Sequence, residues 1–256
     1  MNRIYFFSGT GNSLDAAEKI GKALPGCEII AVTKHTCTEI PAGYERLGFV
    51  FPNYAGGPPS LIADFIRSMN IPEQGDTYLF AVATYGGNAG GLIPLTARQF
   101  KDRGLQLNYG AQIWSYPNWL PPSPKVFSFI NRKTIKQTES LIADILRKEH
   151  RSIPALKASA RMRYDKFMES IHDSDKKYRI SGSCISCGIC GAVCPAKNIS
   201  LENGRPAFHH NCESCMACMN YCPRQAIHTG KKEQKRRRYT HPQAEHKRIM
   251  KYYEKS

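Results

Sequence analysis

The carboxyl-terminal part of this 256-residue chain contains one cysteine pattern twice, and this repeat constrains the fold more than any other feature. Both copies read C-x2-C-x2-C-x3-C-P, the first from Cys184 to Pro195 and the second from Cys212 to Pro223. A tetrahedral zinc site is usually built from two separated C-x2-C pairs, whereas three cysteines at successive three-residue steps suit three corners of an iron–sulfur cube. The spacing therefore predicts two 4Fe-4S centres, in preference to structural zinc ions or a disulfide knot.

The fourth ligand of each centre has to come from outside its own group of three cysteines. When two such runs occur together, the last cysteine of each run ligates the cluster of the other run. We therefore predict two ligand sets that exchange their fourth member. The first cysteine set consists of Cys184, Cys187, Cys190 and Cys222, and the second cysteine set consists of Cys212, Cys215, Cys218 and Cys194. We expect apolar neighbours to bury both centres, namely Ile185, Ile189, Val193, Ile199, Phe208 and Ile227.

Cysteine use also indicates where such a chain works. Eight of its ten cysteines belong to the two runs, and thiolates that bind iron need a reducing compartment. The amino terminus has no secretory pattern, and the sequence contains no run of about 18 apolar residues that could span a membrane. We expect a cytoplasmic protein of an anaerobe.

The first 150 residues alternate between apolar, β-rich runs and segments with helical periodicity. Strands are expected at 2–7, 27–32, 47–52, 77–83 and 105–114. Helices are expected at 14–24, 59–69, 91–104 and 131–150, and the proline-rich stretch 116–124 is expected to be a loop. This alternation predicts an α/β fold with a doubly wound, parallel, five-stranded sheet of order 2-1-3-4-5.

A glycine-rich loop follows the first expected strand and leads into a helix, a position at which backbone N–H groups converge on an anion. Its residues are Ser8, Gly9, Thr10, Gly11, Asn12 and Ser13. A dinucleotide fold would need a third glycine where Leu14 stands and an acid after the second strand, and the sequence has neither. The neutral hydroxyl and amide donors instead suit a terminal phosphate, although an ordinary glycine turn without a ligand is the alternative.

Two further loops, after the third and fourth expected strands, pair an aromatic residue with glycines. The first contains Pro52, Asn53, Tyr54, Gly56 and Gly57, and the second contains Thr84, Tyr85, Gly86, Gly87 and Asn88. In a sheet of order 2-1-3-4-5, these loops meet the first loop at the switch point where flavin mononucleotide (FMN) binds. The tyrosines could stack on the flavin or pack on their own loops, and the same two alternatives apply to Trp114, Tyr116, Asn118 and Trp119.

These motifs resemble a known family over about residues 1–230. SGTGNS, FPNYAGGPP and TYGGN are similar to flavodoxin loops, and the paired cysteine runs are similar to bacterial two-cluster ferredoxins. The chain thus resembles proteins in which a flavodoxin-like domain precedes a ferredoxin domain, which implies FMN, two 4Fe-4S clusters and electron transfer. We expect an FMN domain at 1–150, a basic and partly helical connector at 151–177, the cluster domain at 178–230 and a basic tail at 231–256.

Three functions are compatible with these features. Electrons pass singly between two clusters and a flavin and are exchanged with an external redox protein, or the clusters feed a flavin-dependent reductase of a small organic substrate. The third possible function is that of a binding protein in which the clusters are structural elements. Because the three loops contain no acid or histidine that could donate a proton, electron transfer is favoured over the reductase.

The formal net charge of +15 is concentrated at the carboxyl end, where residues 231–256 contain ten Lys or Arg and three Asp or Glu. The densest run consists of Lys231, Lys232, Lys235, Arg236, Arg237 and Arg238. Such a run is usually solvated. Its functional alternatives are steering of an acidic redox partner, such as a small ferredoxin, or contact with nucleic acid or a membrane surface.

Overall fold

A computed structural model describes residues 1–71, 74–120, 123–230 and 237–254. Its larger part contains a five-stranded sheet in the order β2-β1-β3-β4-β5, and every neighbouring pair in this sheet is parallel. The strands are β1 (Asn2–Phe6), β2 (Cys27–Ala31), β3 (Arg46–Pro52), β4 (Tyr78–Tyr85) and β5 (Tyr109–Trp114). The predicted strand order is confirmed, and only the last strand begins appreciably later than the sequence pattern indicated.

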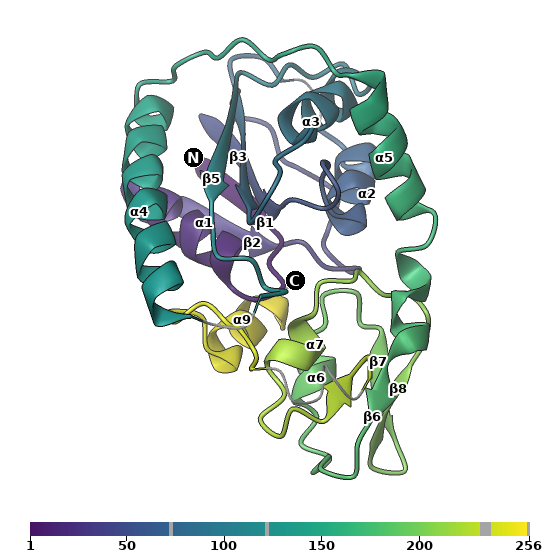
Figure 1. The fold of residues 1–256 in the computed structure, drawn as a ribbon. Helices are drawn as coiled ribbons and strands as arrows, with labels where there is room; N and C mark the ends of the chain where they lie inside the picture. Colours follow the sequence, from purple (N-terminus) through teal and green to yellow (C-terminus); the bar gives the residue numbers. More distant parts are fainter. Residues whose placement is uncertain (72–73, 121–122, 231–236, 255–256) are drawn as a thin grey trace.

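Helices cover both faces of this sheet (Figure 1). The helices are α1 (Asn12–Ala23), α2 (Ser60–Ser68), α3 (Leu92–Lys101) and α4 (Pro124–Leu146). One face carries α1 and α4, which contact each other, and the other carries α2 and α3. The central strands β3 and β4 are buried almost throughout because both of their faces are covered. Helix α4 begins at Pro124, inside the stretch predicted to be a loop, because proline is tolerated in the first turn of a helix.

After α4 the chain crosses the amino edge of the sheet, where Arg151 N donates to Asn108 O, and α5 (Ala158–Met168) then leads it to the carboxyl edge. There residues 172–230 form a smaller unit, the cysteine module (Figure 1). Helix α5 forms the helical part of the connector, and the buried Tyr164 donates a hydrogen bond from its hydroxyl to Pro58 O at 2.8 Å. The remaining elements up to residue 230 are η1 (His172–Lys177), β6 (Arg179–Ile180), α6 (Ile189–Ala192), β7 (Ile199–Glu202), β8 (Arg205–Phe208), α7 (Ala217–Asn220) and β9 (Ile227–His228). Strand β6 pairs with β9 and β7 pairs with β8, both antiparallel.

The end of the chain departs from expectation. Residues 237–254 do not form a solvated tail, because Tyr239, Ile249 and Tyr253 are buried and α9 (His246–Tyr253) lies against the sheet domain beside the cysteine module. Hydrophobic burial of these residues outweighs the solvation expected from the neighbouring charges. The basic residues 231–236 lie outside the described residues. Within the described ranges, no helix has the length and apolar character needed to cross a membrane.

Candidate functional site

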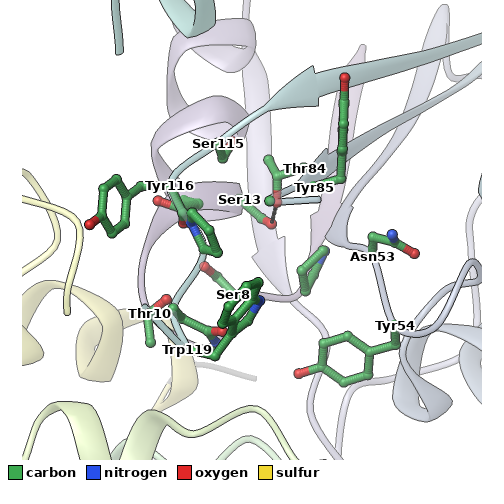
Figure 2. A pocket seen from close by; sticks show the side chains of 16 residues that line it. Ser8, Thr10, Ser13, Asn53, Tyr54, Thr84, Tyr85, Ser115, Tyr116 and Trp119 are labelled. Carbon is green, nitrogen blue, oxygen red and sulfur yellow. Dashed lines mark hydrogen bonds between the residues drawn. The ribbon is translucent and has the colours of Figure 1, made fainter. Parts of the chain in front are cut away.

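A cavity lies at the carboxyl edge of the parallel sheet, where four loops converge (Figure 2). The loops follow β1, β3, β4 and β5, so the switch point of the sheet supplies most of the walls. The lining consists of Ser8, Gly9, Thr10, Asn12, Ser13, Pro52, Asn53, Tyr54, Thr84, Tyr85, Gly86, Ser115, Tyr116, Pro117, Asn118 and Trp119. None of these side chains carries a formal charge at neutral pH, which leaves hydroxyls, amides and aromatic rings as the chemistry of the cavity.

The three predicted loops are therefore brought together, but not every predicted residue faces the cavity. Five of them lie outside the lining, namely Gly11, Gly56, Gly57, Gly87 and Asn88. Asn88 instead holds two loops in place, because Asn53 Nδ2 donates to its carbonyl oxygen at 2.7 Å. Gly57 lies under the Tyr164 ring, where a Cβ atom would come within 2.3 Å of the ring. We infer that these residues support the conformation of the loops without facing the cavity.

The first loop presents its donors from a rigid frame. Ser8, Thr10 and Ser13 are buried at the cavity, and the Ser13 hydroxyl lies 2.8 Å from the Thr84 hydroxyl, which ties α1 to β4 (Figure 2). The loop ends at the amino terminus of α1, where Gly11 has the left-handed φ of 101°. Hydroxyl donors beside a helix amino terminus fit a phosphate dianion, so this donor set is compatible with the phosphate of FMN.

The Asn12 side chain was expected to donate a hydrogen bond to a bound phosphate, but it is occupied by hydrogen bonds within the protein. Its side-chain Nδ2 donates to Tyr116 O at 2.8 Å, and its Oδ1 accepts a hydrogen bond from the Tyr239 hydroxyl at 2.7 Å. The Tyr239 ring also stacks on the Tyr116 ring at a centroid distance of 4.8 Å. Asn12 thus fastens the loop after β5 and the carboxyl-terminal segment to the first loop.

The loop after β5 completes the cavity. Tyr116, Asn118 and Trp119 line it, and Trp119 is 54% exposed at the rim. Trp114 does not line it, because its ring packs edge-on against Phe129 with a centroid distance of 6.0 Å. Sequence reasoning missed Ser115 and Pro117. Their place immediately after the expected fifth strand was a usable signal, since that strand ends at the same edge of the sheet.

The first cysteine set surrounds a second cavity, in the cysteine module. All four of its members line this space, together with Ile185, Leu201 and Arg224. Cys187 is exposed and Cys184 is half-buried. Burial raises the pKa of Cys190 to about 11, and the neighbouring Cys187 and Cys222 contribute in the same direction. The structure therefore places Cys222 with the first run of cysteines rather than with its own.

The second cysteine set is buried in all four members. Burial raises the pKa of the Cys215 thiol well above its ordinary value, and the nearby Cys194 and Cys212 add to the increase. Cys218 has the same two neighbours as well as Cys215. Cys194 thus lies among the cysteines of the second run. Deprotonating so many buried thiols would be costly without a compensating cation, and an iron–sulfur core would supply the compensation.

The backbone of the two cysteine runs follows the same course. Non-glycine residues adopt left-handed φ values at matching positions, 57° at Ser186 and 50° at Ser214, then 50° at Lys197 and 48° at Gln225. Backbone N–H groups also donate to cysteine sulfurs, for example Ser214 to Cys212 at 3.2 Å. Amides that point at sulfur stabilise negative charge there, which is how a protein adjusts the potential of a cluster.

The cavity of the sheet domain and the second cysteine set are in direct contact. A Cβ atom added to Gly9 would lie 2.4 Å from the carbonyl oxygen of Cys215, so only glycine permits this approach. Asn118 Nδ2 donates to the same carbonyl oxygen at 3.3 Å. Close by, the buried Glu213 accepts hydrogen bonds from the Ser60 hydroxyl and from Leu61 N at the start of α2. These hydrogen bonds link the second cysteine run to the start of α2.

The carboxyl-terminal segment also stabilises the contact between the first loop and the cysteine module. His241 N donates to Thr10 O at 2.8 Å, and the Tyr253 hydroxyl donates to Ser8 O. A Cβ atom on Gly11 would lie 2.2 Å from the Cβ of Ala244, whose carbonyl oxygen accepts a hydrogen bond from Tyr221 at 2.9 Å. The segment therefore contacts the first loop and the cysteine module at once.

Comparison with known families agrees with this arrangement. Residues 183–227 match the family model described as a 4Fe-4S dicluster domain. The chain joins a flavodoxin-like domain to a ferredoxin-type domain. The flavodoxin-like domain is the part built on the 2-1-3-4-5 sheet, and the ferredoxin-type domain contains both cysteine sets.

Solved structures similar to the chain include several flavoproteins. One is two-electron reduced flavodoxin of Megasphaera elsdenii, with 21% identity over 44% of this chain and 85% of that one and a TM-score of 0.36. A flavoprotein of Lactobacillus acidophilus in complex with FMN has 14% identity over 44% and 92%, with a TM-score of 0.35. An azoreductase of Bacillus anthracis has 11% identity over 56% and 99%, with a TM-score of 0.40. These scores are low, so the fold assignment rests on the strand order. The search of curated proteins gave no match.

Proposed function

We propose that this protein is an electron-transfer iron–sulfur flavoprotein, in which single electrons pass between two 4Fe-4S clusters and a bound FMN. The observation that carries the proposal is the contact between Gly9 and Cys215, because it joins the anion-binding loop of one domain to a cysteine ligand of the other. A bound cluster supplies one-electron chemistry, and a bound FMN supplies one- or two-electron chemistry. The chain's own contribution is to hold the two sites in fixed contact.

The residues that would hold FMN have separate tasks. Ser8, Thr10 and Ser13 would donate hydrogen bonds to its phosphate, while the aromatic rings of Tyr85 and Trp119 offer apolar surface for the ring system. The neutral lining leaves the phosphate charge to be balanced by the amino terminus of α1. We infer that the two cysteine sets each hold one cluster, the second beside the FMN cavity and the first farther from it.

The first cysteine set is suited to exchange electrons with another protein, because Cys187 is exposed and the apolar Ile185 and Leu201 are 57% and 44% exposed. The exposed arginines Arg205 and Arg224 belong to the same surface, since Arg205 Nη1 donates to Ser181 O at 3.3 Å and Ser183 Oγ donates to Arg224 O at 3.3 Å. Positive charge around an apolar centre favours a partner with the opposite charge. We propose an acidic redox protein, such as a small ferredoxin, as this partner. Its setting would be the reducing cytoplasm of an anaerobe.

An anaerobic redox titration followed by EPR and optical spectroscopy tests the core of the proposal. We expect two iron–sulfur signals and a flavin signal from protein supplied with iron, sulfide and FMN. Stopped-flow reduction by an acidic ferredoxin should reach the clusters first and the flavin afterwards. A protein that binds iron but no flavin would instead support the function of the clusters as structural elements.

The partner surface has its own test. In the double variant Arg205→Glu/Arg224→Glu, the rate constant for reduction by an acidic ferredoxin should fall by 10-fold or more at low ionic strength, and the difference should shrink in high salt. The control Arg132→Glu/Lys136→Glu makes the same total charge change at two exposed positions of α4. Equal rates in the double variant and the control would refute the surface.

A flavin-dependent reductase has less support. The described residues that line the cavity provide hydroxyls and amides but no carboxylate or imidazole that could donate a proton to a substrate. Turnover of small quinones, nitroaromatic compounds or azo compounds by the reduced protein would favour the reductase. Fast exchange with a ferredoxin and slow turnover of such compounds would favour electron transfer.

A further inference from the structure

Tyr54 contains a buried hydrogen-bond donor that the FMN cavity does not explain. Its ring lines the cavity and is half-buried, but its hydroxyl oxygen is inaccessible to solvent and has no hydrogen-bond partner among the described residues. A buried hydroxyl without a partner destabilises the folded protein, because it has lost its hydrogen bonds to water. Such a group therefore needs an explanation, and an absent bound group is a common one.

The position of the hydroxyl is fixed by the ring. Phe7 and Phe167 pack edge-on against Tyr54, with centroid distances of 6.1 Å and 6.2 Å, so the ring has little freedom to turn. Figure 2 shows the ring extending from the β3 loop toward the interior, away from Asn53. The loop itself is closed by the hydrogen bond from Tyr54 N to Gly57 O at 2.8 Å.

Tyr54 packs against the hydrophobic cluster that contains Cys215, and Gly9, which lines the same cavity as Tyr54, approaches the Cys215 backbone. Burial raises the pKa of Tyr54 well above its ordinary value, and the next causes are the charges of Cys215, Glu213 and Cys212. Glu213 is already engaged, because its two oxygens accept hydrogen bonds from Ser60 and Leu61. Among the cysteines of the second set, Cys212 already has a hydrogen bond with Tyr178. Cys215, the first charged neighbour of Tyr54, and the sulfides of a bound cluster are then the candidate acceptors for this donor.

We propose that the Tyr54 hydroxyl donates a hydrogen bond to a sulfur of the cluster held by the second cysteine set and thereby raises the reduction potential of that cluster. The reduced cluster carries one more negative charge than the oxidised cluster, so the hydrogen bond is stronger after reduction. Among the described residues, no tyrosine lines the cavity of the first set. An electron would then favour the cluster beside FMN over the exposed cluster. The inference rests on the proposed function only in requiring that the second set binds iron.

The test compares Tyr54→Phe with Tyr44→Phe. Tyr44 is a matched control because its hydroxyl is also buried without a partner among the described residues, but its charged neighbours are Arg3 and Glu28 rather than cysteines. Both variants should keep full iron content, since phenylalanine preserves the shape of the ring. In EPR redox titrations, Tyr54→Phe should lower the potential of one cluster and leave the other unchanged, and Tyr44→Phe should change neither.

A direct measurement complements the potentials. ENDOR spectra of the reduced protein exchanged into D2O should show a strongly coupled exchangeable deuteron that is missing in Tyr54→Phe, in addition to those from Tyr178 and the backbone amides at Cys212. Unchanged cluster potentials in Tyr54→Phe would overturn the proposal, as would a shift confined to the flavin. These readouts need no flavin and no redox partner. Protein that fails to bind FMN would refute the proposed function while leaving the hydrogen bond testable.

Discussion

The two cysteine sets are built from the same sequence pattern but occupy opposite environments. The residue that follows the first cysteine of each run illustrates the difference. In the first run it is the apolar Ile185, which is 57% exposed, and in the second it is the acidic Glu213, which is 3% exposed. This is the reverse of the usual preference of apolar and charged side chains. The second set lies against another domain, while the first faces solvent.

The difference shows that the ligand pattern and the surroundings of a cluster are determined separately. Cysteine spacing fixes which side chains can bind iron, because ligands three residues apart lie on one compact turn. Glu213 is buried because Ser60 and Leu61 provide partners for its carboxylate. Ile185 is free to remain at the surface, where we propose that a redox partner binds. Ile185 lines the cavity of the first set, as expected, but is itself largely exposed, whereas Val193 and Ile227 are buried.

The largest contrast should come from removing one ligand from each set. Cys215→Ala should lose about half of the bound iron and abolish flavin reduction, because the second set lies between the first set and the cavity. Cys187→Ala should lose a similar amount of iron but retain flavin reduction by a small chemical reductant that reaches the second set. Iron analysis and stopped-flow spectroscopy measure both. If flavin reduction survives only in Cys215→Ala, the proposed order of the sets is wrong.

A smaller effect should follow from adding one methyl group at the contact between domains. Gly9→Ala places a Cβ atom 2.4 Å from the Cys215 carbonyl oxygen, and overpacking of this kind costs about 1–3 kcal/mol of unfolding free energy. We also expect weaker FMN binding, measured by fluorescence titration. Gly191→Ala provides a contrast within the first run, since its nearest neighbour is Ile199 O at 2.9 Å and it lies away from the cavity. That variant should lose stability without losing FMN affinity, and equal losses of affinity would contradict the interpretation.

We expect the buried Glu213 to make the stability of the folded protein depend on pH, and we expect no such effect from Ile185. Burial raises the pKa of Glu213 in the folded protein above its value in the unfolded chain, so folding favours the protonated carboxyl group. The contribution of Glu213 to the free energy of unfolding is fully present below about pH 4.3, the pKa in the unfolded chain. It is lost as the pH rises through the folded-state pKa, by about 1.4 kcal/mol for each pH unit between the two pKa values. Relative to Glu213→Gln, the wild-type protein should therefore lose stability over this window. Urea denaturation across a pH series measures the effect, and Ile185→Gln is the control.

Parallel pH profiles for the wild-type protein and Glu213→Gln would contradict this prediction. They would mean that the hydrogen bonds from Ser60 and Leu61 fully offset the burial of the carboxylate.

The smallest expected change in stability concerns the N-cap residues of the two short helices α6 and α7. Gly188 precedes α6 and Met216 precedes α7, with left-handed φ values of 75° and 60°. A left-handed conformation costs a side chain roughly 1 kcal/mol that glycine does not lose. Met216→Gly should therefore change stability by less than about 1 kcal/mol, since relief of strain offsets lost packing. Thermal unfolding measures it, and a loss of several kcal/mol would show that packing of Met216 dominates.

Much of the fold and the cavity could be predicted from local patterns. Alternating strands and helices gave the parallel sheet, since each segment carries its own periodicity. The loops at Ser8, Tyr54 and Tyr85 meet at one cavity because parallel strands end at the same edge. The roles of Asn12 and Trp114 could not be read in this way, because their partners Tyr239 and Phe129 are distant in the sequence.

The carboxyl-terminal segment was predictable only in its composition. Its charge suggested solvation, yet Tyr239 and Tyr253 insert against the first loop and are buried. The signal was the recurrence of tyrosines and Ile249 among the basic residues, which a charge-based interpretation overlooks. Whether such residues are buried depends on a complementary surface elsewhere in the molecule, and no local pattern reports that surface.

The sequence by itself determined the chemistry of this protein. Cysteine spacing specifies iron ligands, and glycines with hydroxyl residues specify an anion-binding turn, because both depend on neighbours a few residues apart. Tertiary structure alone decided which cysteine set meets the cavity, through the approach of Cys215 to Gly9 and the anchoring of Glu213 on α2. These contacts join residues more than 150 positions apart, and packing between complementary surfaces selects them.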